Sequence, residues 1–145
     1  MNGGRRTLPF AQQRMIFLAL LAGMVLYAGT VAFVLQSNGG RGLADQPVPL
    51  PDTAVTIVAG SLLLAAFVLR GVLRGRAAQQ QGPARTQALF VSTLVPLALI
   101  EGACLLATTM WMLSGSTVPH LVTAAVALCT AITIVPFTDP DATQP

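Results

Sequence analysis

The sequence predicts an all-α integral membrane protein, a bundle of four transmembrane helices. Two observations predict this fold class. The 145-residue chain is 54% hydrophobic and only 9% charged, whereas water-soluble domains carry about 25% charged residues. Its apolar residues also fall into four long runs separated by segments rich in glycine, proline or arginine, and about 20 apolar residues are enough for a helix to cross a bilayer. We therefore expect residues 1–145 to form a single membrane domain.

The first helix is predicted over about residues 15–36. Its apolar run is longer than the roughly 7–15 apolar residues of a secretory signal and ends without a small-residue cleavage pattern, so we expect an uncleaved span. Tyr27 lies near the centre of this run. A buried phenol needs a hydrogen-bond partner, so Tyr27 is expected to face the bundle. Three residues separate Ala19 from Gly23, and small residues at this spacing are typical of close helix contacts in membranes.

The second helix is predicted over about residues 53–73. The preceding segment, 37–52, is rich in glycine and proline and cannot hold a regular helix. Asp52 stands where a helix N-cap belongs. The apolar run gives way at Arg70, whose long side chain can reach the membrane surface and so allows the helix to extend a further turn.

The third helix is predicted over about residues 86–114, with Pro96 inside it. A proline in this position removes one backbone hydrogen bond and usually kinks a helix. The fourth helix is predicted over about residues 119–137, and Thr117 is the candidate cap before its first turn. The tail, 138–145, is expected to be disordered.

Orientation follows from the basic residues, which are all arginines. In a four-helix topology the N-terminus, the second loop and the C-terminus share one side of the membrane. Basic residues concentrate on the cytoplasmic side, so both termini are expected there, in a bacterial inner (plasma) membrane. Arg70, Arg74, Arg76 and Arg85 are expected to fix this topology and to meet lipid headgroups. The arginines on this side are Arg5, Arg6, Arg14, Arg70, Arg74, Arg76 and Arg85, and Arg41 stands alone on the other.

Glu101 is the residue with the clearest claim to function, because it is a carboxylate at the midpoint of the apolar run 88–113. An ionisable group at that depth costs about 2.5–3.5 kcal/mol on insertion scales and normally faces a partner rather than lipid. Helical spacing places Thr93, Cys104 and Thr108 on the same face, which gives a weakly polar stripe centred on the carboxylate. Because desolvation disfavours the charged form, we expect this carboxyl to be protonated at neutral pH unless a cation or water reaches it.

Three roles for Glu101 stay open from the sequence. It can be a neutral hydrogen-bond donor that holds helices together within the chain, an ion- or proton-binding group, or a contact to a partner subunit. No arginine or lysine of this chain is expected to be embedded at the depth of Glu101 and pair with it.

The segment Arg85-Thr-Gln-Ala-Leu, followed by Pro96-Leu-Ala-Leu-Ile-Glu101-Gly-Ala, resembles the second helix of the proteolipid (c-type) subunit of rotary ATP synthases. The resemblance covers the hairpin from about Thr53 to Leu113, and a further helix stands at each end of it. It implies that Glu101 is the ion-binding carboxylate and that Arg85 belongs to the polar loop.

Other chemistries leave no trace in the sequence. Two cysteines and one histidine do not form a metal-binding pattern, and there is no glycine-rich phosphate loop. Cys104 and Cys129 lie at similar depths on neighbouring helices, where a disulfide is conceivable, but buried cysteine usually behaves as a small apolar residue. We expect no catalytic residues, no metal, no cofactor and no nucleic-acid partner.

The sequence therefore favours a non-catalytic multi-pass membrane protein, an accessory, structural or assembly subunit of a larger complex. Its expected partners are the lipid bilayer and other membrane subunits or further copies of itself. The alternative is proteolipid-like proton or ion handling through Glu101.

Overall fold

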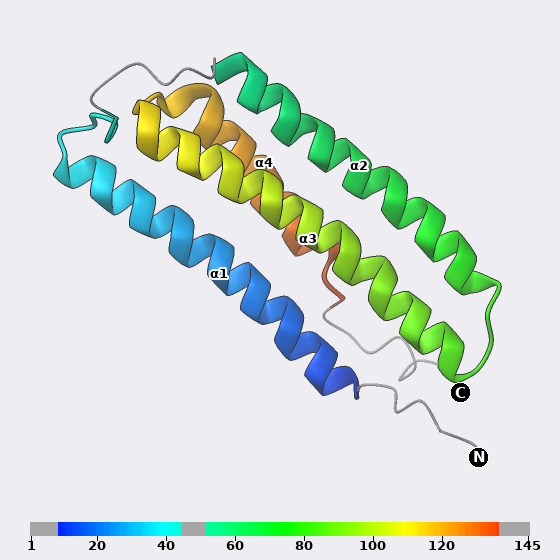
Figure 1. The fold of residues 1–145 in the computed structure, drawn as a ribbon. Coiled ribbons are helices and arrows are strands. Elements are labelled where there is room, and N and C mark those ends of the chain that lie inside the picture. Colours follow the sequence, from blue (N-terminus) through cyan, green and yellow to red (C-terminus); the bar gives the residue numbers. More distant parts are fainter. Residues whose placement is uncertain (1–8, 45–51, 137–145) are drawn as a thin grey trace.

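The computed structural model describes residues 9–44 and 52–136. These residues form four helices and no strand: α1 (Phe10–Ser37), α2 (Asp52–Ala78), α3 (Pro83–Ser114) and α4 (Thr117–Ile134) (Figure 1). Each helix is long and apolar enough to cross a membrane. The all-α fold class with four candidate spans is thus confirmed. The expected disordered tail and Arg5 and Arg6 lie outside the described residues.

Helix α3 lies at the centre of the arrangement. It packs against all three other helices, whereas α1 and α2 lie on opposite sides of it and make no contact with each other in the described ranges (Figure 1). Phe17 stacks near Phe90, with ring centroids 5.6 Å apart, and Tyr27 meets Thr109 further along both helices. Helices α1 and α3 therefore run parallel, and α2 and α4 run in the opposite direction.

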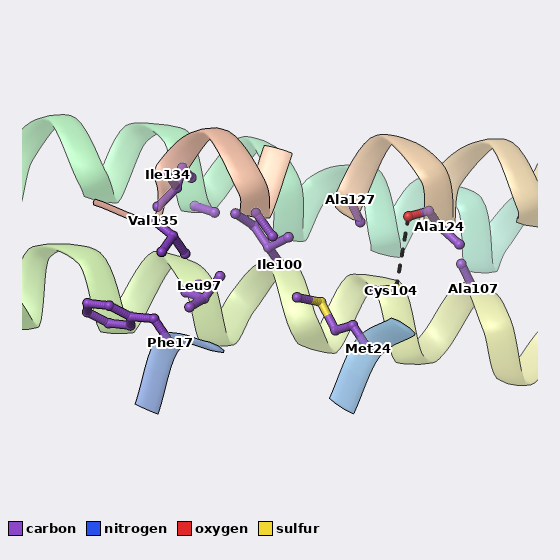
Figure 2. Packing of buried hydrophobic residues seen from close by; sticks show 12 residues of the cluster. Phe17, Met24, Leu97, Ile100, Cys104, Ala107, Ala124, Ala127, Ile134 and Val135 are labelled. Atoms are coloured by element: carbon purple, nitrogen blue, oxygen red, sulfur yellow. Dashed lines mark hydrogen bonds between the residues drawn. The ribbon is translucent and has the colours of Figure 1, made fainter. Parts of the chain in front are cut away.

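The core forms where α3 meets α4 and α1. In Figure 2, Leu97 and Ile100 of α3 face Ile134 of α4, while Phe17 and Met24 of α1 approach from the other side. The outer faces of the helices remain apolar: Met15 and Leu26 each expose 71% of their surface. A helix that is apolar on its outer face as well as its inner one is suited to lipid rather than water.

Three helices begin or end beyond their predicted limits. Helix α1 begins at Phe10 instead of residue 15, α2 continues to Ala78 instead of 73, and α3 begins at Pro83 instead of 86. The predictions followed the apolar runs, but alanine, glutamine and arginine are also good helix formers. Pro83 occupies the first turn, where its missing N–H removes no helical hydrogen bond.

Helix α4 instead ends earlier than predicted, at Ile134 rather than 137. Val135 has φ −68° and ψ 123°. This extended conformation is the one that a following proline imposes, because the ring of Pro136 clashes with a helical residue before it. At the other end, Val118 has non-helical dihedrals, so regular helix begins close to the predicted residue 119.

Helix α3 continues from Pro83 to Ser114 with Pro96 inside it. Pro96 is fully buried, and the neighbouring Ser92 hydroxyl donates to the Leu89 carbonyl at 2.7 Å. The proline therefore lies in the packed interior and does not divide the helix into two.

The loop after α1 closes the end of α3. The N–H groups of Leu43 and Ala44 donate to the carbonyls of Met112 and Leu113, at 3.0 and 3.2 Å. Gly115 follows with φ +70°, a left-handed conformation, and its N–H returns to Trp111 at 2.9 Å. These bonds satisfy carbonyls that a helix end otherwise leaves without donors.

Candidate functional site

The polar stripe predicted on the third helix is buried in the structure. Thr93, Cys104 and Thr108 are at most 4% exposed, and Glu101 is half-buried at the edge of the same face. Because α3 is the helix around which the others pack, this stripe faces the interior of the molecule. Helical spacing placed Thr93, Cys104 and Thr108 on one face, and that face is buried here. Glu101 lies at the edge of this face and not at its centre.

Around Glu101, the stripe satisfies its own hydrogen bonds. Thr93 donates to the Leu89 carbonyl at 3.2 Å, and Thr108 donates to the Cys104 carbonyl. The Cys104 thiol lies 4.0 Å from the Ala124 carbonyl of α4, a contact drawn as a dashed line in Figure 2. A hydroxyl that donates to a carbonyl of its own helix already has a hydrogen-bond partner. Thr93 and Thr108 therefore do not require the Glu101 carboxylate as an acceptor.

Glu101 itself has no hydrogen bond or ion pair among the described residues. Among the described residues, the fully buried side-chain nitrogen and oxygen atoms that lack a hydrogen-bond partner are Arg70 Nε and His120 Nδ1. The Glu101 oxygens also lack a partner but are not among these atoms, so they are not fully buried. The bond from Glu101 to an internal threonine or carbonyl, one of the three expected roles, is not formed here. The carboxylate is therefore half-buried and at least partly accessible at the surface of the chain.

The four arginines assigned to lipid headgroups separate into two kinds. Arg74, Arg76 and Arg85 are exposed. Arg70 is half-buried, and its Nη2 donates to the carbonyl of Ile134 at 3.4 Å. Ile134 is the last residue of α4, where the helix dipole presents partial negative charge, so a cation there is favourable. This hydrogen bond from Arg70 therefore also links α2 to the C-terminal end of α4.

The structure brings Asp52 of α2 and His120 of α4 together. Their Oδ1 and Nε2 atoms lie 3.1 Å apart. His120 is 1% exposed, whereas the Asp52 side chain is 40% exposed. Asp52 is the first residue of α2 and His120 lies near the start of α4. Both helices start on the same side of the bundle, so the four-helix topology contained a signal for this pair. It links the first turn of α2 to the first turn of α4.

The two cysteines do not meet. Both are free, with Cys104 buried and Cys129 exposed. Cys104 packs against the carbonyl of Ala124, on the side of α4 that faces α3. The conceivable disulfide is therefore not formed, and Cys104 behaves as a small buried side chain. No group of three or more histidine, cysteine or acidic residues in the described ranges is placed to hold a metal ion.

Comparison of the chain with protein-family models, with curated proteins and with solved structures finds no match.

Proposed function

We propose that this chain is a small non-catalytic membrane protein, an accessory, structural or assembly subunit of a larger complex in the bacterial inner membrane. The observation that supports this most directly is the Glu101 carboxylate, half-buried on α3 and without a partner in the described part of the chain. An ionisable side chain at membrane depth is costly unless it is paired. A neighbouring chain that supplies the missing hydrogen bond removes this cost.

The orientation belongs to the same proposal. The up-and-down order of the helices gathers Arg14, Arg74, Arg76 and Arg85 at one end of the molecule and Arg41 at the other (Figure 1). By the positive-inside rule, the end with more arginines lies in the cytoplasm together with both termini. Reporter fusions at the two termini that are active only in the periplasm test this orientation, and activity at either end contradicts it.

The test of the subunit role is recovery of the protein from its own membrane in mild detergent, followed by native mass spectrometry. We expect one or two copies together with different subunits. Glu101→Gln retains a hydrogen-bonding group and should keep these partners, whereas Glu101→Leu should lose them. Gly102→Ala is the matched control, because a Cβ added at Gly102 meets no atom within 4 Å. Recovery of the wild type alone, or unchanged partners with Glu101→Leu, contradicts the proposal.

The second candidate function is proton or ion handling through Glu101. It is supported by the same half-buried, unpaired carboxylate and by the resemblance of the hairpin to proteolipid subunits. It predicts that a hydrophobic carbodiimide labels Glu101 in membranes and that labelling falls as pH rises. Glu101→Gln should abolish labelling and Asp52→Asn should not. Recovery as a ring of many identical copies favours this function, and absence of labelling in folded protein excludes it.

A further inference from the structure

A groove of about 380 Å³ lies between the end of α2 and the start of α3. Its polar wall consists of Arg76, Gln80 and Gln87, and its apolar wall includes Leu73 and Val91. Small-molecule sites in proteins are about 300–1,000 Å³ and combine apolar walls with a few polar groups. The size and lining of this groove fit that pattern.

The groove changes from polar to apolar along its length. On α2, the chain passes from Leu73 through Arg76 to Gln80 as it leaves the apolar span. On α3, it passes from Gln87 to Val91 as it enters the next span. Because α2 and α3 are antiparallel neighbours joined by residues 79–82, the polar groups lie together at the membrane surface. Leu73 and Val91 lie together on the hydrocarbon side.

The polar groups of the groove are free to bind a ligand. Arg76, Gln80 and Gln87 are exposed, and among the described residues their side chains take part in no hydrogen bond or ion pair. Arg70 differs, because its guanidinium already donates to the end of α4. Arg74 is exposed on the same helix but does not line the groove. Among these arginines, Arg76 is the one aimed at the groove.

We propose that this groove binds a phospholipid with an anionic headgroup. The Arg76 guanidinium has a planar fork of donors that matches phosphate oxygens. The amides of Gln80 and Gln87 add neutral donors, and an acyl chain lies along Leu73 and Val91. Basic pockets between transmembrane helices are suited to anionic headgroups. The headgroup and the adjoining part of one acyl chain occupy the α2–α3 groove. This proposal does not depend on the role of Glu101.

The test is a lipid titration of the purified full chain in neutral detergent, followed by native mass spectrometry. The probes are dioleoylphosphatidylglycerol, dioleoylphosphatidylcholine and the soluble headgroup glycerol 3-phosphate. We expect one bound phosphatidylglycerol and about tenfold weaker binding by Arg76→Gln, in line with the loss of a charge-assisted hydrogen bond. Arg74→Gln is the matched control and should change binding less than twofold. Arg76→Lys retains the charge and should recover part of the affinity.

Equal losses in Arg74→Gln and Arg76→Gln overturn the proposal, since the effect is then general charge attraction. Equal affinity for phosphatidylcholine overturns the requirement for a net anionic headgroup. Binding of glycerol 3-phosphate as tight as that of the lipid overturns the lipid as occupant, since the apolar wall then contributes nothing. Arg76 is exposed, so its replacement should leave the fold intact, and an unchanged circular dichroism spectrum checks this.

Discussion

The phenol oxygen of Tyr27 on α1 lies 2.8 Å from the hydroxyl of Thr109 on α3. Thr109 also donates its single hydroxyl proton to the carbonyl of Leu105, at 2.7 Å. Tyr27 is therefore the donor and Thr109 the acceptor. This side-chain hydrogen bond links α1 to the central helix, and it confirms the expectation that Tyr27 faces the bundle.

Tyr27→Phe should weaken the attachment of α1 to α3. Interhelical hydrogen bonds in membrane proteins average about 0.6 kcal/mol in double-mutant cycles, so we expect a coupling near that value between Tyr27→Phe and Thr109→Val. The measurement is unfolding in mixed micelles of the wild type, both single variants and the double variant. Strictly additive effects of the two substitutions would show that the bond contributes nothing.

Arg70→Met should destabilise the end of α4. The substitution keeps an unbranched apolar stem but removes the donor to Ile134 and the charge beside the helix C-terminus, which contributes about 0.3–1 kcal/mol in similar settings. Hydrogen exchange of the last-turn amides of α4 should become faster. Arg74→Met is the control, because Arg74 is exposed and makes no such bond. Equal exchange in the two variants would contradict a specific role for Arg70.

Asp52→Ala should destabilise the end of the bundle where α2 and α4 begin by about 1–3 kcal/mol, because it leaves the buried imidazole of His120 without its hydrogen-bond partner. Asp52→Asn retains an acceptor oxygen and should cost less. The control is Thr53→Ala at the exposed neighbouring position. Thermal unfolding of the three variants in detergent measures the effect, and an Asp52→Ala variant as stable as Thr53→Ala would argue against the pair.

Gly115→Ala should destabilise the contact between the segment that follows α1 and the turn that joins α3 to α4. Gly115 has φ +70°, and an added Cβ collides with the backbone of Gly42. A non-glycine residue in such a conformation costs about 1–3 kcal/mol before the collision is counted. Gly102→Ala, with open space around its Cβ, is the control and should be neutral or slightly stabilising. Similar unfolding midpoints for the two variants would contradict this close approach.

Much of the candidate site could be predicted, because helical spacing alone fixes which residues share a face. Thr93, Cys104 and Thr108 therefore lie together, as expected. Spacing within one helix cannot show which of its faces meets another helix. Ala19 and Gly23 have the spacing of a contact pair, yet both are exposed. Sequence alone could not decide between inner and outer faces of α1, since both are apolar.

The sequence by itself determined the all-α class, the four spans and their order, because hydrocarbon requires long apolar helices whose backbone groups bond internally. It also placed the Glu101 carboxylate at the midpoint of an apolar run. Only the tertiary structure decided that α3 is central, that Arg70 reaches α4 and that Asp52 meets His120. These relationships depend on the packing of helices distant in sequence. When a helix is apolar on every side, its sequence does not specify which side packs against a neighbouring helix.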